Sequence, residues 1–189
     1  GITSLSYALT VVLDPFTQYY WRVRGSNNCT TGSFGAVYNF TTGNTLCSTF
    51  SSTDVPVTIP SSGSPTVTSD LTISNTGTIT DINVKDLEIS HTWVEDLTVS
   101  LTSPAGTVVT LFDQICGSQN NVLISFDDQS PNAHSSIPCP PVDGLTYQPD
   151  GSLADFNAEN GDGTWILTVA DAENQDGGTI DAWDVEVCF

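Results

Sequence analysis

Basic residues are scarce in this sequence. Three Lys and Arg stand against 22 Asp and Glu, which gives a formal net charge of −19 at pH 7 and a pI near 4.1. A chain with this charge repels phosphate backbones and anionic lipids, so we expect neither nucleic acid nor a membrane as a partner. The acidic groups are suitable ligands for hard cations such as calcium, although the same charge would also keep a secreted protein soluble.

Methionine and long apolar runs are also missing. Because there is no initiator methionine, we expect the sequence to be a segment of a longer protein. No apolar run approaches the roughly 18 residues that a membrane-spanning helix needs. No stretch resembles the apolar core of a signal peptide, so we expect any targeting signal outside this segment.

Signatures of catalysis are absent. The sequence has no Gly-x-Ser-x-Gly elbow, no His-Glu-x-x-His zinc motif and no phosphate-binding loop. Of its two histidines, His91 ends an apolar segment beside Thr92 and is interpreted as a structural hydrogen-bonding residue, while His134 lies in a polar loop. We therefore expect no enzymatic activity in this segment.

Five cysteines are present in a chain with many Ser, Thr, Asn and Gly residues, which is typical of extracellular proteins. None of them forms a Cys-x-x-Cys or Cys/His zinc pattern. Cys116 and Cys139 lie at the two ends of a loop-rich insert, and Cys47 and Cys188 lie near the two ends of the C-terminal part. We expect these two disulfides, which leaves Cys29 free, and we expect the protein to be secreted.

From residue 54 onward the chain shows the alternation of half-buried strands, and helical periodicity is absent. The phase of the apolar residues shifts between Val84 and Leu87, which predicts a β-bulge near Lys85 and Asp86. One short helical turn is expected near residues 153–156. The predicted strands lie at residues 55–60, 66–74, 79–92, 96–103, 107–112, 122–126, 165–170 and 179–187, with an irregular insert at 127–160.

This pattern predicts an all-β fold, a jelly-roll β-sandwich over residues 54–189. A polar linker at residues 44–53 is expected before it, and residues 1–43 are expected to be a separate piece.

The first 43 residues contain the set Leu13-x-Pro15-x-Thr17-x-Tyr19, followed by Trp21. This set resembles the C-terminal part of a fibronectin type III domain. It implies that Tyr19 is a tyrosine-corner residue whose hydroxyl bonds the backbone just upstream. Strands are expected at residues 6–12, 19–24 and 37–42.

A fragment of about 40 residues cannot bury enough surface alone. Three interpretations remain open for residues 1–43. The fragment leans on the neighbouring domain, pairs with another chain as a homo-oligomer, or is the remnant of a proteolytic cut.

Residues 50–189 contain three ordered motifs. The first is His-Thr at residues 91–92, Asp-Leu at 96–97 and Ser-Pro-x-Gly-Thr at 103–107. The second is Gly-x-Trp-x-Leu-x-Val at residues 163–169, and the third is the last strand, beginning Gly-Thr-Ile-Asp-Ala-Trp at residue 178. Together they resemble the P domain that follows the catalytic domain in kexin- and furin-like proprotein convertases and in many bacterial secreted proteases. The insert between the cysteines at 116 and 139 is of the bacterial rather than the convertase style.

The resemblance implies a galactose-binding-like jelly roll that acts as a non-catalytic accessory domain. Its partner would be the catalytic domain of a secreted peptidase, of subtilisin-like serine or zinc type. Its role would be to support the folding, stability or substrate access of that domain. The alternative is a β-sandwich module that binds carbohydrate or a cell surface, because jelly rolls often carry such sites.

Clustered carboxylates in loops are the candidate metal ligands. Asp127 and Asp128 follow the strand at 122–126, while Asp171, Glu173 and Asp176 lie in the loop between the last two strands. Such loops supply the oxygen ligands that calcium prefers, so we expect Ca²⁺ as a cofactor. Ordinary turn chemistry explains Asp and Gly in these loops almost as well.

Three further residues are given structural roles. Asp96 is interpreted as a loop cap rather than a ligand. Trp165 and Trp183 alternate in phase with neighbouring apolar residues and are assigned to the core. Trp93 lies in a turn and is the aromatic residue to test as a contact with a ligand.

Overall fold

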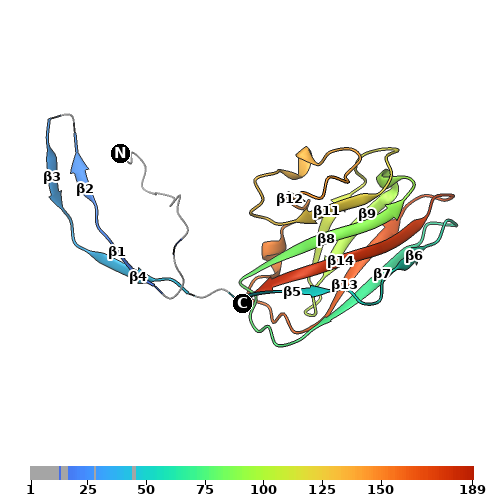
Figure 1. Cartoon of the computed structure of the whole chain (residues 1–189), viewed down its shortest axis with the longest axis horizontal. Helices are drawn as coiled ribbons and strands as arrows, with labels where there is room; N and C mark the ends of the chain where they lie inside the picture. The colour runs from blue at the N-terminus through green and yellow to red at the C-terminus, as the bar shows by residue number, and fades with distance from the viewer. Residues whose placement is uncertain (1–12, 14–16, 28, 44–45) are drawn as a thin grey trace. The chain divides into compact units, whose positions relative to one another are not determined.

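The computed structural model describes residues 13, 17–27, 29–43 and 46–189, and the chain divides into two units, Gly1–Thr45 and Leu46–Phe189 (Figure 1). Within the described residues every regular element is a strand or a single 3₁₀ turn. No described helix is long and apolar enough to cross a membrane.

The first unit contains two short antiparallel ribbons. Strand β1 (Gln18–Trp21) pairs with β4 (Tyr38–Thr41), and β2 (Arg24–Ser26) pairs with β3 (Thr31–Phe34). The predicted strand at 6–12 and residues 14–16 just upstream of Tyr19 lie outside the described residues, so the fibronectin-like assignment and the tyrosine corner stay predictions. The β2–β3 ribbon was not predicted, because its Gly, Ser and Asn residues indicate a turn.

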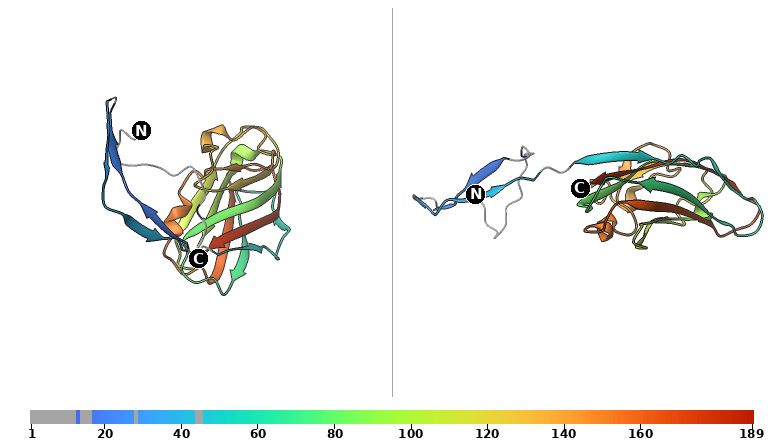
Figure 2. Two further views of the ribbon diagram at one scale, coloured as in Figure 1. Left: turned by 60° about the vertical axis from the view of Figure 1, so that its left-hand side comes forward. Right: turned by 90° about the horizontal axis from the view of Figure 1, so that it is seen from below.

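The second unit is a sandwich of two β-sheets (Figure 2). One sheet has the strand order β10-β9-β13-β7, and the other has the order β12-β11-β8-β14-β5, with β6 also pairing with β14. All pairings are antiparallel except β11 with β12. The all-β jelly-roll sandwich predicted from the sequence is confirmed. Its strands are β5 (Cys47–Ser51), β6 (Val57–Ile59), β7 (Thr66–Ile73), β8 (Asp81–His91), β9 (Leu97–Thr102), β10 (Val108–Asp113), β11 (Val122–Phe126), β12 (Thr146–Tyr147), β13 (Gly163–Asp171) and β14 (Gly178–Cys188).

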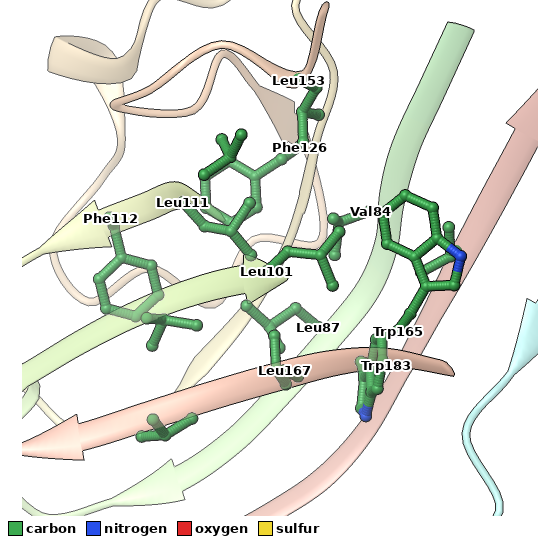
Figure 3. Close-up of a cluster of buried hydrophobic side chains, with 14 of the residues drawn as sticks. Val84, Leu87, Leu101, Leu111, Phe112, Phe126, Leu153, Trp165, Leu167 and Trp183 are labelled. Atoms are coloured by element: carbon green, nitrogen blue, oxygen red, sulfur yellow. The ribbon is translucent and has the colours of Figure 1, made fainter. Parts of the chain in front are cut away.

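Alternation along the strands builds the core between the sheets (Figure 3). Trp165 on β13 and Trp183 on β14 are fully buried. The Trp165 indole donates to the carbonyl of Gly161 (3.0 Å), and the Trp183 indole donates to Oγ of Ser69 (2.7 Å). Both polar ring atoms therefore have partners, which removes the penalty for burying them.

The expected bulge in β8 is present. Between the pairs Val84–Phe126 and Leu87–Ile124, two residues of β8 oppose the single residue Ser125. Asp86 has a positive φ of 49°, and its amide donates to Oγ of Ser125 (3.0 Å). The hydroxyl of Ser125 thus replaces a ladder hydrogen bond that the bulge interrupts. The expected helical turn is also present, as the 3₁₀ turn η3 (Leu153–Phe156).

Two strands lie where irregular chain was expected. Residues 44–53 were predicted to be a linker, but β5 occupies Cys47–Ser51 and pairs with β14 at the edge of the larger sheet. The segment Cys-Ser-Thr-Phe-Ser is mostly polar because an edge strand with alternating exposure buries little. The insert at 127–160 contains the two-residue strand β12, which is too short to produce a pattern in the sequence.

Candidate functional site

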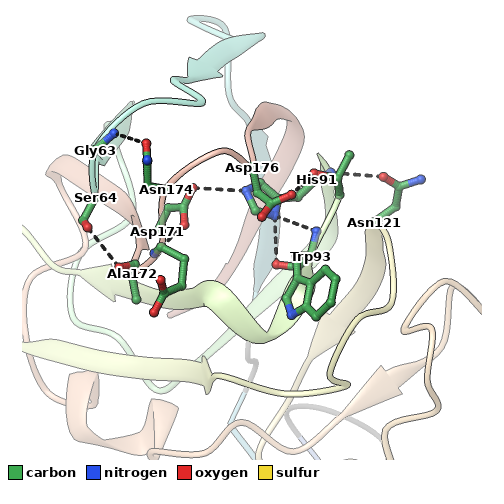
Figure 4. A network of polar contacts seen from close by, with 11 residues as sticks. Gly63, Ser64, His91, Trp93, Asn121, Asp171, Ala172, Asn174 and Asp176 are labelled. Atoms are coloured by element: carbon green, nitrogen blue, oxygen red, sulfur yellow. Dashed lines mark hydrogen bonds and ion pairs between the residues drawn. The ribbon is translucent and has the colours of Figure 1, made fainter.

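The end of the sandwich where β8 finishes holds a buried polar pair (Figure 4). Nε2 of His91 lies 3.3 Å from Oδ2 of Asp171, and Nδ1 of His91 is 2.9 Å from the carbonyl oxygen and 3.2 Å from the amide nitrogen of Trp93. Because Nε2 faces a carboxylate, it must carry a proton. In the neutral ring Nδ1 then accepts a hydrogen bond from the Trp93 amide, and in the protonated ring Nδ1 donates one to the Trp93 carbonyl. Both protonation states of His91 therefore have partners.

Backbone packing brings this pair together. Gly178, the first residue of β14, lies opposite His91 in the β8–β14 ladder. A Cβ atom at Gly178 would be 1.7 Å from the carbonyl oxygen of Ser90, so only glycine permits this approach. His91 thereby reaches Asp171, which ends β13 in the opposite sheet.

The loop between β13 and β14 is held by its own polar side chains. Oδ1 of Asp176 accepts from the hydroxyl of Thr92 (2.8 Å), and Oδ1 of Asn174 accepts from the amide of Gly63 (2.9 Å). Oδ1 of Asp171 accepts from the amide of Glu173 (3.1 Å). Two of the three predicted metal ligands in this loop are therefore already hydrogen-bond acceptors.

Asp96 lies in the same region, but it is not the loop cap that the sequence predicted. It is buried (8% exposed), and the 3₁₀ turn η1 (Val94–Asp96) has no side-chain cap. Among the described residues, Asp96 makes hydrogen bonds through its backbone atoms only. Burial raises the pKa of the Asp96 carboxyl above its ordinary value, and the nearby carboxylates of Asp171, Asp176 and Glu173 raise it further. Desolvation and like charge therefore both act against ionisation at this position.

The other two predicted metal ligands lie elsewhere and differ from each other. Asp128 accepts hydrogen bonds from the hydroxyl of Ser152 (2.9 Å) and from the amides of Leu153 (3.0 Å) and Ala154 (2.8 Å). It therefore caps the start of η3 with both carboxylate oxygens. Oδ1 of Asp127 accepts from the amide of Gln129 (2.6 Å), which leaves its Oδ2 without such a bond among the described residues.

Asp127 and Asp128 lie near Asp81, at the opposite end of β8 from His91. Burial raises the pKa of Asp81, and the charges of Asp127 and Asp128 add to this effect, against hydrogen bonds from Asn83 and Ile82 that lower it. Strand β8 has 11 residues, which at about 3.3 Å per residue places its ends roughly 30 Å apart. The five predicted metal ligands therefore belong to two distant places.

In the described part of the chain, no three His, Cys, Asp or Glu side chains are grouped closely enough to hold a metal ion by themselves. A cation at either end of β8 would need oxygens from amide side chains or the backbone. Asp81, Asn83 and Gln129 were not predicted from the sequence. Asp81 and Gln129 lie beside Asp127, and the amide of Asn83 donates to Asp81. An Asp-x-Asn pair at the start of a strand is the signal that could have indicated Asp81 and Asn83.

Two disulfides join the pairs that the sequence predicted, Cys47–Cys188 and Cys116–Cys139. Cys29 is exposed and unpaired. The four bridged sulfurs are unavailable as nucleophiles. His134 lies in the 3₁₀ turn η2 (His134–Ser136), and its Nδ1 atom has no hydrogen-bond partner among the described residues.

Exposed aromatic rings are distributed unevenly between the two units. Among the described residues of Leu46–Phe189, Trp93 is the one large aromatic side chain that is exposed (41%). The first unit exposes Tyr20, Trp21, Phe34, Tyr38 and Phe40. Trp21 stacks on Tyr38, with ring centroids 5.0 Å apart. The sandwich thus lacks, in its described residues, the exposed aromatic pair that a sugar-binding platform would need.

The three sequence motifs occupy defined places in the sandwich. In the first motif His91 ends β8, Asp96 ends η1 and Leu97 opens β9. The turn that follows β9 closes with the amide of Gly106 donating to the carbonyl of Ser103 (2.9 Å). Gly106 has a φ of 93°, which suits glycine. The Gly-x-Trp-x-Leu-x-Val run is β13, and the last motif is β14.

Comparison with known proteins gives one family match and several relatives. A model of the Proprotein convertase P-domain matches residues 79–187. Leupeptin-inactivating enzyme 1 of Streptomyces exfoliatus is 29% identical over 130 residues, which cover 68% of this chain but only 24% of that protein.

Among solved structures, the serine protease of Aeromonas sobria in complex with the chaperone is 20% identical, with a TM-score of 0.46, over 76% of this chain and 26% of that one. The structure of the A. sobria serine protease gives 17% identity and a TM-score of 0.38, over 93% of this chain and 27% of that one.

The matched residues 79–187 include β8 to β13 and nearly all of β14, and therefore His91, Asp171 and both core tryptophans. They make up more than half of the chain. The chain belongs to the proprotein convertase P-domain family, whose members are accessory domains of peptidases.

Proposed function

We propose that this chain is the non-catalytic accessory domain of a secreted peptidase of the subtilisin-like serine or zinc type. Its task would be to support the folding, stability or substrate access of the catalytic domain. The match of residues 79–187 to the P-domain family carries the proposal. The name of the Streptomyces relative, an enzyme that inactivates leupeptin, is consistent with a peptidase-related parent.

The chemistry of the sandwich supports a role through rigidity and surface. Its buried histidine is paired with Asp171, and its four cysteines are bridged. Trp165 and Trp183 fill the core rather than line a site. The disulfides favour secretion, because such bonds persist in oxidising compartments.

Calcium is part of the proposal. An ion that binds only the folded domain stabilises it by mass action. Twenty-one of the 22 acidic residues follow residue 45, so cation binding would also relieve repulsion within the sandwich.

The first unit is proposed as the contact with a second copy of the chain. Its aromatic side chains are exposed, and it carries two of the three basic residues, Arg22 and Arg24, which lie over the Phe34 ring. Two sandwiches of high negative charge repel each other, whereas the first units carry little net charge and repel each other only weakly. Sedimentation velocity at 100 mM salt tests this. Trp21→Ser should shift a dimer to monomer, and a monomeric wild type would contradict the contact.

The test of the main proposal is a deletion in the full-length parent peptidase. Removing residues 46–189 should lower the yield of folded catalytic domain and its melting temperature. The same deletion should leave kcat towards a small chromogenic peptide nearly unchanged in whatever folds. A truncated enzyme with normal yield and stability would contradict the accessory role. Retention of the isolated chain on an insoluble polysaccharide would instead favour a carbohydrate-binding module.

A further inference from the structure

Two carboxylates and a carboxamide from separate segments meet at the start of β8. Asp81 is the first residue of this strand, and Asp127 and Gln129 directly follow β11, which pairs antiparallel with β8. The terminal amide atom of Gln129 that faces them lies 2.8 Å from Oδ1 of Asp127 and 3.1 Å from Oδ1 of Asp81. The strand pairing thus sets these three side chains against one another.

The Gln129 amide has two useful orientations here. With its nitrogen towards the carboxylates it donates a hydrogen bond to each, which suits the protein without a cation. With Oε1 towards them, three oxygens would face one another without a proton to share, an arrangement that requires a cation between them.

A second observation at the same place is a buried side-chain oxygen without a partner. Asn83 is only 6% exposed, and its amide nitrogen donates to Oδ2 of Asp81 (3.2 Å) and Oε2 of Glu186 (3.1 Å). Its Oδ1 atom is buried and has no hydrogen-bond partner among the described residues. Buried acceptors are normally satisfied. The nitrogen of this amide faces Asp81 and Glu186, so turning the amide would bring the unpaired oxygen to face these carboxylates, which requires a cation between the oxygens.

We propose that this group is a calcium site in which Asp81, Asp127 and Gln129 provide side-chain oxygens, and in which the Asn83 amide turns to offer a further one. The inference rests on the calcium-stabilised role proposed above and assigns residues to it. Two negative charges balance the ion. Gln129 is exposed while Asp81 and Asp127 are half-buried, so solvent can reach the site and water can complete the coordination.

The neighbouring groups fit the site less well. Asp128 uses both carboxylate oxygens to cap η3. At the far end of β8, Asp171 and Asp176 already accept hydrogen bonds from His91, Glu173 and Thr92. Only two carboxylates and two amides form the proposed site, which is consistent with the absence of any trio of His, Cys, Asp or Glu in the described chain.

The test is calcium titration of the full 189-residue chain, by calorimetry and by thermal melts in EDTA and in CaCl₂ up to 10 mM, with MgCl₂ in parallel. We expect a dissociation constant of about 10⁻⁴–10⁻³ M, as in other extracellular modules, and a melting temperature that rises by several degrees. Asp127→Asn should weaken binding by about tenfold or more, because ligand charge sets affinity. Asp150→Asn is the matched control, since this exposed carboxylate makes no side-chain hydrogen bond with any described residue.

A gain-of-charge variant keeps the test independent of lost folding. Gln129→Glu places a third carboxylate at an exposed position, so it should lower the melting temperature in EDTA and tighten calcium binding. A variant that weakens binding or leaves it unchanged would overturn the assignment.

The remaining outcomes separate this inference from the broader proposals. If calcium still shifts the melt of Asp127→Asn fully, and Asp176→Asn abolishes the shift, the ion binds in the β13–β14 loop and this assignment is wrong. If magnesium binds more tightly than calcium, the assignment of calcium to this site is wrong. If wild-type protein responds to neither ion at 10 mM, calcium fails altogether, while the accessory role still stands or falls by the deletion experiment.

Discussion

Nε2 of His91 lies 3.3 Å from Oδ2 of Asp171, and both side chains are fully buried although 80 positions separate them in the sequence. The contact joins the end of β8 in one sheet to the end of β13 in the other. Removing one member of a buried pair leaves the other charge or donor without compensation.

His91→Ala should therefore lower the free energy of unfolding by about 3 kcal/mol. The double variant with Asp171→Asn should lose less than the sum of the single losses, because the two side chains interact directly. Urea denaturation of the four proteins measures the coupling. His134→Ala, which removes the imidazole of η2, is the control. Strictly additive losses would show that the pair contributes no coupling.

Asp96→Asn should stabilise the domain at neutral pH. A carboxyl whose pKa is raised in the folded state binds its proton more tightly there, so stability falls as pH rises from the ordinary value of 3.8 through the folded pKa. The amide cannot ionise and avoids this loss. Melting temperatures are measured in EDTA between pH 3.5 and 7.5, with Asp150→Asn as control. The melting temperature of Asp96→Asn should exceed that of wild type by a growing amount as the pH rises above 3.8. Parallel curves would contradict the raised pKa.

Tyr147 should titrate late. Its hydroxyl donates to Oδ2 of Asp143 (2.6 Å), and this hydrogen bond, with burial, raises the pKa of Tyr147 to about 12. Its contribution to stability is complete below pH 10 and disappears as pH rises through 12. Tyr147→Phe should cost about 1.5 kcal/mol at pH 8 and progressively less above pH 10. Ultraviolet absorbance at 295 nm should show a phenol that ionises with a pKa of about 12 in wild type but not in Tyr147→Phe. Absorbance curves of wild type and Tyr147→Phe that coincide above pH 10 would rule this out.

The two disulfides should contribute different amounts to the free energy of unfolding. Cys47–Cys188 closes 141 residues and Cys116–Cys139 closes 23. On loop entropy alone, replacing the first pair by serine should cost about 5 kcal/mol and the second about 3 kcal/mol. Guanidinium midpoints of the two double-serine variants provide the comparison, and a larger loss from the shorter loop would contradict this order.

Asp128→Ala should weaken the domain whether or not calcium is present. Its carboxylate accepts from Ser152, Leu153 and Ala154, so its loss leaves the amides of η3 without their acceptor. A loss of about 1 kcal/mol is expected in EDTA and in calcium alike. A loss seen only in calcium would instead indicate that Asp128 is a ligand.

Alternation predicted the strands of the sandwich because their inward residues are apolar and their outward residues polar. The bulge in β8 was visible as a phase shift for the same reason. Strand β5 was not predicted because its stability comes from pairing with β14 and from a disulfide, neither of which needs apolar residues. Local pattern cannot show contributions made by a distant partner.

The candidate site was only partly predictable. Asp127 stands out as part of an Asp-Asp pair after a strand, but Asp81 and Gln129 look like ordinary turn residues. They become neighbours only because β8 and β11 run antiparallel in one register. Asp128, identical in type and adjacent in sequence, turned out to serve η3. Which of two neighbouring carboxylates is free for an ion depends on the contacts of each.

The bridge between Cys47 and Cys188 lies where the first and last strands of the sandwich pair. A pulling force between the chain before Cys47 and the chain after Cys188 would therefore run through a covalent bond. The strands between them would carry none of that load. Tension of this kind would stretch the flanking polypeptide while the jelly roll kept its shape.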